Sequence, residues 1–434
     1  MLELDILRDK REEVIAGLKK RGVGKDILEA VDTAVVLDEK RKTLQKQMDD
    51  QLAQINNISK EIGSLFGRAK AGDEDAREKA EEAKKKVADF KALVSKVESE
   101  HQEVKAKISE LLYDIPNVPH HSVPAGAGED DNEVYQDAAK ALPELGEGAK
   151  PHWELGEEYK LFNFEWGTKL TGSGFPVYTG KGAALERALI SFFLSEATMA
   201  GYLEVMPPLM VNEDTARGTG QLPDKEAQMY HVEKDNFYLI PTAEVPITNI
   251  YRDVIVTEED LPIKLTGYTP CFRREAGSYG ADVKGLNRVH QFDKVEIVQL
   301  SHPEESYEQL KGMLKQVEGL LIKLGLPYRI LRLCGGDMGF TSALTFDFEV
   351  YSPGQKRWLE VSSVSNFETF QSNRMKIRYK NGKGKPTLVH TLNGSALALP
   401  RIMAALLEMN QTENGITIPE VLVPFTGFDI IRKN

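Results

Sequence analysis

The chain has 434 residues, which is long enough for two or three domains. Hydrophobic residues make up 41% of it and charged residues 28%, and no run approaches the roughly 20 apolar residues that span a bilayer. Residues 1–11 lack the apolar segment of a secretory signal. With Cys271 and Cys334 as the two cysteines, neither a disulfide framework nor a thiolate zinc site is expected. We therefore expect a cytoplasmic protein with no membrane contact and no zinc.

The net charge of −12 is unevenly distributed along the chain. Residues 1–112 carry a net charge of −1, and the remainder carries −11. A uniformly acidic protein would repel nucleic acid, so any basic surface for such a partner has to be local.

The N-terminal part has the pattern of helices. Residues Asp5–Arg21 predict a short amphipathic helix that ends at Gly22–Gly24. Residues Ile27–Phe66 predict one long helix, and the segment Gly67–Asp75 predicts a break, with Asp73 or Asp75 as the N-cap of a second helix. The apolar stripe of the first long helix consists of Leu44, Met48, Leu52, Ile55, Ile62 and Leu65.

The second long helix carries a regular apolar stripe. Its spacing alternates between four and three residues, as in a coiled-coil seam. The stripe consists of Ala76, Ala80, Ala83, Val87, Phe90, Val94, Val97, His101, Val104, Ile108 and Leu111. Pro116 and Pro119 end this helix. Periodicity alone suits a dimerisation coiled coil or a scaffold rod as well as an intrachain hairpin, but the short turn and matched helix lengths favour the hairpin.

The rest of the chain changes in character. Residues 113–168 are rich in Pro, Gly and acidic residues and predict a connector, and residues 169–434 predict a separate domain. Short β-branched runs there predict strands at Phe237–Ile240, Ile263–Phe272, Arg288–Leu300, Tyr328–Cys334, Thr345–Tyr351 and Arg357–Ser362. Helices are expected at Ala183–Met199, Glu304–Leu324 and Ser395–Asn410. Without a regular βαβ period, this pattern predicts an α+β fold, with helices on an antiparallel sheet.

Several common site motifs are missing. The sequence has no Gly-rich phosphate loop, no G-x-G-x-x-G unit after a strand, no G-x-S-x-G elbow and no His or Cys cluster with metal spacing. If the protein binds a nucleotide, arginines have to hold its phosphates.

Two segments could supply such arginines. Arg273 follows a predicted strand, and Glu275 lies two residues further on the same side of an extended chain. In the following strand, Arg288, His290, Phe292, Lys294 and Glu296 share one face in period 2. An aromatic ring among charges suits a nucleotide pocket, although a solvated strand with one exposed ring fits equally well.

Two further segments carry polar groups. Glu360, Val361, Ser362 and Ser363 end a predicted strand with oxygen atoms suited to a hard cation or a phosphate. Arg401 lies near the start of an apolar helix, where the helix dipole disfavours a cation unless an anion binds there.

Taken together, these segments resemble the signature motifs of the class II aminoacyl-tRNA synthetases. Residues Gly201–Pro208 look like motif 1, residues 272–292 look like motif 2, and residues 394–401 look like motif 3. Residues 218–223, 242–244 and 290–296, together with the N-terminal hairpin, narrow the resemblance to the bacterial-type seryl-tRNA synthetase family over nearly the whole chain.

The resemblance implies an ATP site. Arg273 and Arg401 would be catalytic: Arg273 would clamp the α-phosphate and the serine carboxylate, and Arg401 would contact the γ-phosphate. The other residues implied to bind ATP are Arg274, Glu275, Val289, Phe292, Glu360, Val361, Ser362 and Ser363. Glu275 would meet the adenine amino group, and Phe292 would stack on the ring. Glu360 and Ser363 would help to hold Mg²⁺. Arg274 and Pro400 depart from the usual residues at their positions.

The resemblance also implies a serine site and a tRNA partner. Serine would be bound by Thr242, Ala243, Glu244, Arg273, Glu296 and Ser395. A homodimer would form through motif 1, and the hairpin, residues 1–112, would grip the serine tRNA and leave the anticodon unread, with selenocysteine tRNA as a further substrate. Lys60, Arg68, Lys70 and Lys84–Lys86 could line one side of the hairpin. The expected function is serine–tRNA ligase, and the alternatives are a ligase that loads a carrier protein and an inactive coiled-coil binding protein.

Overall fold

The computed structural model describes residues 1–138, 142–143, 145–146, 148–225, 227–274, 284–380, 382 and 384–433. The chain forms two compact units. We call the unit made of Leu2–Ile15 and Val23–Pro116 the arm. We call the unit made of Met1, Ala16–Gly22 and Asn117–Asn434 the body.

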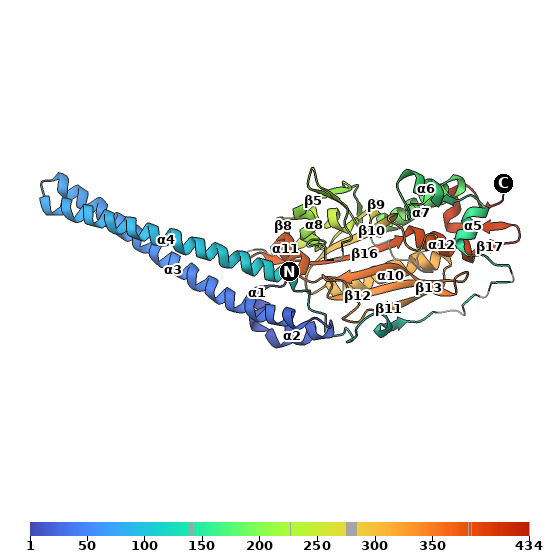
Figure 1. The fold of residues 1–434 in the computed structure, drawn as a ribbon, viewed down its shortest axis with the longest axis horizontal. Coiled ribbons are helices and arrows are strands. Elements are labelled where there is room, and N and C mark those ends of the chain that lie inside the picture. Colours follow the sequence, from blue (N-terminus) through green and yellow to red (C-terminus); the bar gives the residue numbers. More distant parts are fainter. Residues whose placement is uncertain are drawn as a thin grey trace. The chain divides into compact units, whose positions relative to one another are not determined.

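Two long helices that run side by side make up most of the arm (Figure 1). Helix α3 spans Lys25–Lys70, which corresponds to about 69 Å of helix, and α4 spans Glu74–Asp114. The expected break within Gly67–Asp75 is confirmed, but α3 continues for three residues past Gly67, and the chain turns at Ala71–Gly72, where Gly72 has φ of +100°. Asp73 is the N-cap of α4, and its carboxylate accepts a hydrogen bond from the backbone of Ala76.

The expected seam between the helices is largely confirmed. In α3 the buried residues include Leu44, Ile55 and Leu65, and in α4 they include Ala76, Ala80, Ala83, His101, Val104 and Ile108. Leu52 was expected in the seam but is 44% exposed, because two helices cover only a narrow stripe of each other's surface. The expected single helix Asp5–Arg21 is two helices, α1 (Leu4–Asp9) and α2 (Arg11–Lys20), which separate at Lys10.

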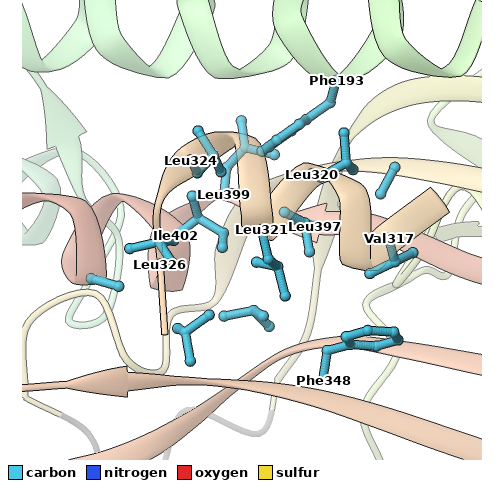
Figure 2. Packing of buried hydrophobic residues seen from close by; sticks show 14 of the residues in the cluster. Phe193, Val317, Leu320, Leu321, Leu324, Leu326, Phe348, Leu397, Leu399 and Ile402 are labelled. Atoms are coloured by element: carbon cyan, nitrogen blue, oxygen red, sulfur yellow. The ribbon is translucent and has the colours of Figure 1, made fainter. Parts of the chain in front are cut away.

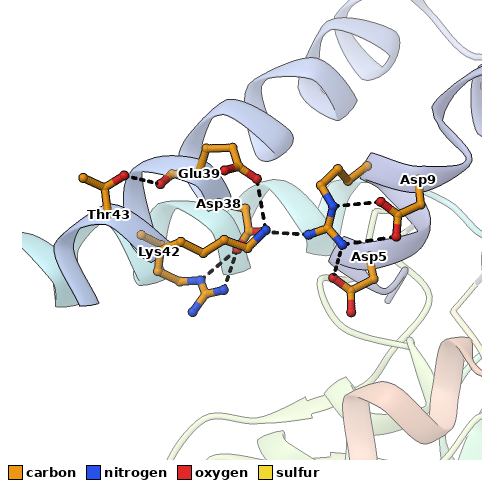
Figure 3. A network of polar contacts seen from close by, with 8 residues as sticks. Asp5, Asp9, Asp38, Glu39, Lys42 and Thr43 are labelled. Atoms are coloured by element: carbon orange, nitrogen blue, oxygen red, sulfur yellow. Dashed lines mark hydrogen bonds and ion pairs between the residues drawn. The ribbon is translucent and has the colours of Figure 1, made fainter. Parts of the chain in front are cut away.

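Figure 3 shows a polar network at one end of the arm. Asp38 of α3 is buried and receives the cations of Arg41 at 2.7 Å, Lys42 at 3.0 Å and Arg8 at 3.8 Å. Although burial opposes ionisation, the hydrogen bonds from Arg41 and Lys42 hold the pKa of Asp38 below its usual value. The network therefore fixes α1 against α3.

An eight-stranded sheet is the framework of the body (Figure 1). The strand order is β1-β11-β12-β13-β16-β10-β9-β4. The neighbours are antiparallel except for β4, which is parallel to β9. The strands are β1 (Glu133–Gln136), β4 (Leu203–Glu204), β9 (Ile263–Phe272), β10 (Gln291–Ser301), β11 (Tyr328–Arg332), β12 (Leu344–Ser352), β13 (Arg357–Asn366) and β16 (His390–Ala398). The predicted α+β class, with an antiparallel sheet, is confirmed.

The two faces of the sheet have different roles. Phe346, Phe348 and Val350 of β12 belong to the main apolar cluster, and Thr345 and Asp347, which alternate with them, line a cavity. Figure 2 shows the apolar side, where residues of α10 pack together with residues of α7, β12 and α12. Alternation along a strand therefore separates core from site.

The remaining elements surround this sheet. The helices of the body are α5 (His152–Glu158), α6 (Phe164–Leu170), α7 (Gly180–Met199), α8 (Glu213–Thr219), α9 (Glu244–Asn249), α10 (Ser306–Leu324), α11 (Phe370–Met375), α12 (Leu399–Met409) and α13 (Val423–Thr426). The short strands are β2 (Phe162–Asn163), β3 (Val177–Tyr178), β5 (Met210–Asn212), β6 (His231–Val232), β7 (Phe237–Leu239), β8 (Ile255–Thr257), β14 (Arg378–Lys380), β15 (Thr387–Leu388), β17 (Gln411–Thr412), β18 (Gly415–Thr417) and β19 (Ile430–Ile431). The 3₁₀ turns are η1 (Glu129–Asp131), η2 (Glu258–Asp260) and η5 (Glu420–Leu422).

Two expected boundaries near the site were wrong. Ser395 was expected to open a helix, but it lies in β16, because residues 390–398 pair with β10 on one side and β13 on the other, and α12 begins at Leu399. The strand expected at Arg288–Leu300 begins at Gln291. Within the described part of the chain, none of the helices has the length and apolar character needed to cross a membrane.

Candidate active site

A cavity of about 600 Å³ opens on the polar face of the sheet. Strands β10, β12, β13 and β16 and the first turn of α12 line it. Of the residues expected to bind ligands, the cavity brings together Thr242, Glu244, Arg273, Val289, Phe292, Glu296, Glu360, Val361, Ser362, Ser363, Ser395 and Arg401. These residues are up to 159 positions apart in the chain, so folding of the sheet is what assembles them.

One part of the cavity holds a buried triangle of polar groups. Lys294 Nζ lies 2.7 Å from Glu296 Oε2 and donates to Thr242 Oγ1 at 3.0 Å. Thr242 Oγ1 in turn donates to Glu296 Oε2 at 3.1 Å. The Glu296 side chain is only 1% exposed. Because one oxygen of this buried carboxylate already has partners, the carboxylate is fixed in position, and its other oxygen can pair with a second cation.

Glu244 lies beside this triangle. Its Oε1 accepts a hydrogen bond of 2.6 Å from Gln371 Nε2, and Gln371 Oε1 accepts one of 2.7 Å from Thr391. Burial, together with the nearby charge of Glu296, raises the pKa of Glu244 to about 7. Glu244 can therefore be neutral or charged near physiological pH, and in either form it presents polar oxygen atoms to a small ligand.

Arg273 follows the end of β9, as expected from the sequence. Its guanidinium lies 5.2 Å from the centre of the Phe292 ring, and its Nε donates to the carbonyl of Pro241 at 3.3 Å. The pairing of Phe292 with Cys271 across β9 and β10 brings the ring and the arginine to the same place. A planar cation beside a partly buried aromatic ring suits an aromatic base that carries phosphates.

Arg401 occupies the third position of α12. Its Nε donates to the carbonyl of Asn287 at 3.0 Å, and its Nη1 donates to the carbonyl of Glu360 at 2.6 Å. Glu360 Oε2 lies 3.4 Å from the same Nη1 in a half-exposed ion pair. Arg401 thus reaches the cavity from the helix N-terminus, and both the cation and the helix dipole favour an anion there.

Oxygen atoms of carboxylates and hydroxyls gather on β12 and β13. Asp347 pairs with Ser363 across these strands, and Glu349 pairs with Glu360 after a bulge. Burial and the charge of Glu360 raise the pKa of Asp347 well above its usual value, and the buried Oδ1 has no hydrogen-bond partner among the described residues. The segment 360–363 was expected to end a strand, but it lies inside β13, which runs on to Asn366.

Three expected residues have other positions, and a fourth is not among the described residues. Ala243 is buried in a small apolar cluster with Ile247 and does not line the cavity. Arg274 lies over the ring of Tyr230 instead, with 5.9 Å between guanidinium and ring centre. His290 precedes β10, so the expected shared face does not include it, and its Nδ1 lies 2.9 Å from the Tyr230 hydroxyl. Glu275 lies outside the described residues.

Sequence reasoning assigned no role to three residues of the site. Lys294 was recognised on the strand face, but a buried partner for Glu296 was not foreseen. A place for Asp347 on the polar face of a strand could have been predicted, because residues 345–351 alternate polar and aromatic or aliphatic side chains. The sequence pattern does not indicate a role for Gln371, since only the fold brings α11 to Glu244.

Two family models match the chain. Residues 230–410 match the tRNA synthetase class II core domain (G, H, P, S and T), and residues 1–119 match the seryl-tRNA synthetase N-terminal domain. With the antiparallel sheet and its cavity, the first match defines a class II tRNA synthetase.

Relatives narrow this class. A serine–tRNA ligase from Salinibacter ruber is 50% identical over 99% of this chain and 98% of its own length, and one from Chlorobaculum parvum is 46% identical over the full length of both. The crystal structure of seryl-tRNA synthetase from Pyrococcus horikoshii complexed with ATP superposes over 100% of both chains with a TM-score of 0.90 at 34% identity. The chain belongs to the serine–tRNA ligase family. It is an enzyme that uses ATP to join serine to tRNA.

Proposed function

We propose that the cavity binds ATP and L-serine next to each other, with the Thr242–Lys294–Glu296 triangle as the serine end and Arg273 and Arg401 as the phosphate clamps. The observation that carries this proposal is that one cavity holds a buried carboxylate with a cation partner, an arginine beside an aromatic ring, and a second arginine in the first turn of α12. The ATP complex of the Pyrococcus horikoshii enzyme supports the ATP part.

At the phosphate end, the first reaction joins the serine carboxylate to the α-phosphorus of ATP. A carboxylate oxygen forms the new bond to phosphorus, and the bond to the bridging oxygen breaks, so that pyrophosphate leaves with its electron pair. Both partners are anions, so the reaction needs charge neutralisation and in-line positioning more than it needs an acid or a base. Arg273 would neutralise charge on the α-phosphate and the carboxylate, and Arg401 would hold the γ-phosphate.

The adenine base would stack on Phe292. The guanidinium of Arg273 lies beside this ring, so the base and the first phosphate would be held by neighbouring groups. The backbone of Val289, which lines the cavity, would contact the base, and Glu275 would meet its amino group.

At the serine end, Glu296 would pair with the substrate ammonium while Lys294 keeps its present bond to the same carboxylate. Glu244, Thr242 and Ser395 would hydrogen-bond the substrate hydroxyl. Alanine lacks this hydroxyl and would leave buried polar groups unpaired, which corresponds to rejection by roughly 10⁴-fold or more. Threonine keeps the hydroxyl and would be excluded by size.

Mg²⁺ would be held by Glu360 and Ser363. The described residues contain no group of three or more His, Cys, Asp or Glu side chains with metal geometry. Mg²⁺ usually takes one or two carboxylates and fills the rest of its shell with water and phosphate, so the two residues fit, and the unpartnered Oδ1 of Asp347 adds a third hard oxygen nearby. Bound with ATP, the ion would neutralise charge on the phosphates.

The arm would grip the tRNA. Lys60, Arg68, Lys70 and Lys84–Lys86 all have exposed side chains on α3 and α4, as a phosphate-contacting surface requires. Some of this charge is already paired within the arm: Lys84 lies 2.8 Å from Glu81, and Arg68 lies 2.7 Å from Asp73.

A second copy of the chain would cover the motif 1 region. Met199, Leu203 and Met206 are 69%, 64% and 87% exposed, which is high for apolar side chains close together in sequence, and β4 is an edge strand of the sheet. A cytoplasmic location is supported by Cys271 and Cys334, both of which are free thiols in the body and suit a reducing compartment.

The proposal is tested by ATP–pyrophosphate exchange with serine, alanine, threonine and glycine, followed by charging of serine tRNA. We expect exchange with serine, at least a hundredfold less with the other three amino acids, and charging of the tRNA. Exchange that does not depend on serine would contradict the proposed serine site. Serine-dependent exchange without tRNA charging would favour a ligase that loads a carrier protein.

A further inference from the structure

The side chains of His152 and Glu408 form a buried pair behind the cavity. Both side chains are 0% exposed, and neither residue lines the cavity. His152 opens α5, and Glu408 lies in the last turn of α12, seven residues after Arg401. Glu408 Oε1 accepts hydrogen bonds of 2.9 Å from both the backbone N–H and Nδ1 of His152.

The surroundings of Glu408 fix which nitrogen of His152 carries the proton. Its second oxygen, Oε2, accepts from the Ser352 hydroxyl and from the backbone of Gly354 at 3.1 Å. Although burial opposes ionisation, the hydrogen bonds from His152 and Ser352 hold the pKa of Glu408 below its usual value. An ionised carboxylate can only accept, so Nδ1 of His152 is the donor in this pair, which leaves Nε2 to act as an acceptor.

On the other side of the ring, Nε2 of His152 accepts a hydrogen bond. The backbone N–H of Leu286 donates to His152 Nε2 at 2.9 Å. Such an approach needs a glycine at position 285, because a Cβ there would lie 2.3 Å from Nε2, and Gly285 also has φ of +66°. The ring of His152 therefore fixes the return segment, residues 285–290, which leads into β10.

The next residue connects this segment to the proposed ATP site. The carbonyl of Asn287 accepts the 3.0 Å bond from Arg401 Nε, and its side chain donates to Gln355 Oε1 at 2.8 Å. Leu286 and Asn287 both line the cavity and are almost fully buried. The chain of contacts thus runs from the last turn of α12 through His152 and the return segment to the first turn of the same helix.

We propose that His152 is a positioning residue for ATP: by accepting from Leu286 it fixes the Asn287 carbonyl, which in turn aims the guanidinium of Arg401 into the cavity. This inference rests on the proposed role of Arg401 toward the phosphates. It adds a residue that positions Arg401. The serine triangle of Thr242, Lys294 and Glu296 makes none of these contacts, so the effect is confined to ATP. Loss of the acceptor should therefore weaken ATP binding and leave serine binding unchanged.

Two substitutions in the full-length enzyme separate the acceptor from the bulk of the ring. In His152→Asn the amide can still donate to Glu408, but the side chain is too short to accept from Leu286. In His152→Gln the longer side chain can place its oxygen near the position of Nε2. Kinetics of ATP–pyrophosphate exchange should show a KM for ATP about tenfold higher in His152→Asn and within about threefold of the unmodified enzyme in His152→Gln. The KM for serine should stay within twofold in both variants.

A matched control removes another histidine of the body. His390 is partly buried, bonds to Ser306 at 2.8 Å and does not line the cavity, so His390→Asn removes a hydrogen-bonded histidine of the body without affecting the ATP site. The inference is overturned if His152→Asn leaves the KM for ATP unchanged, raises both KM values equally, or behaves like His390→Asn. Arg401→Ala measured in parallel tests the underlying assignment: an unchanged KM for ATP in that variant would refute the ATP role of Arg401 itself.

Discussion

Although Asp38 of the arm is buried, the lysines expected to contact tRNA and the charged groups of the cavity lie in different environments. In the arm, cations such as Lys85 and Lys86 are exposed, and an interhelical pair such as Lys40–Glu100 is about half exposed. In the body, Lys294 and Glu296 are buried against each other. An exposed charge can be replaced at little cost in stability, whereas a buried pair loses several kcal/mol if one partner is removed. The difference suggests that the arm binds by the sum of many weak contacts and the body by few contacts with fixed geometry.

The arm and the body also differ in the fraction of residues that their elements bury. Helix α3 has six buried residues among its 46, and strand β10 has eight among its 11, and the structure describes every residue of both elements. A two-helix arm buries one stripe of each helix, while a central strand is covered on both faces. The arm can therefore be shortened without loss of a core, and the body cannot.

The largest expected effect follows from shortening the arm. Lys40 and Glu100 form an ion pair of 2.7 Å across α3 and α4, so residues 44 and 96 lie at about the same height in the hairpin. Replacing residues 45–95 by a four-residue Gly-Ser linker should lower kcat/KM for tRNA charging more than about 10³-fold and leave serine-dependent exchange within about threefold. Charging that survives this change would show that the arm does not grip the tRNA.

Removal of an arginine from the cavity should impair the activation step and, through it, tRNA charging as well. Arg273→Ala should lower kcat/KM for ATP–pyrophosphate exchange by about 10³-fold, because the guanidinium neutralises charge where it develops. Arg273→Lys should recover little, since an ammonium lacks the planar fork. The contrast between arm and body would fail if exchange were unaffected while tRNA charging alone decreased. Arg252, which bonds Thr215 at 3.2 Å and does not line the cavity, supplies the matched control Arg252→Ala.

A pH-dependent stability is expected for the body. Burial and the charge of Glu296 raise the pKa of Glu244 from its ordinary value of 4.5 to about 7. The contribution of Glu244 to stability is therefore complete below pH 4.5 and is lost as the pH rises through about 7. Relative to the unmodified enzyme, Glu244→Gln should gain roughly 2 kcal/mol of unfolding free energy between pH 5 and pH 8. Urea unfolding at several pH values measures this gain, and a pH-independent difference between the two proteins would contradict the shifted pKa.

The smallest effect is expected from the exposed lysines of the arm. Substitution of Lys84, Lys85 and Lys86 by alanine should raise the KM for tRNA about tenfold, flatten its dependence on salt and leave exchange unchanged. The control replaces Lys169, Lys234 and Lys380, which are exposed on the body, and changes the net charge equally. Equal effects of the two triple variants would mean that overall charge, rather than a surface on the arm, governs tRNA binding.

The sequence by itself determined the arm almost completely. Its two helices and their seam follow from an apolar spacing that every turn repeats, and the cap at Asp73 depends on residues three positions away. The break begins after Lys70 rather than at Gly67, because a single glycine costs a helix only about 1 kcal/mol, which the neighbouring turns can offset. The strand that ends just before Arg273 and the strand that carries Phe292 were likewise predicted, since period-2 patterns are local.

Only the tertiary structure decided which side chains meet. Thr242 meets Lys294 and Glu296, Gln371 meets Glu244, and His152 meets Leu286, and in each case the partners come from elements far apart in the chain. Ser395 was read as helical because an apolar run follows it, and pairing of β16 with strands on both sides made it part of the sheet instead. Local spacing along the chain specifies a helix or a strand. The position of a buried polar group depends instead on hydrogen-bond partners that are distant in the sequence. Burial requires such a group to be hydrogen-bonded, and only the fold brings its partners to it.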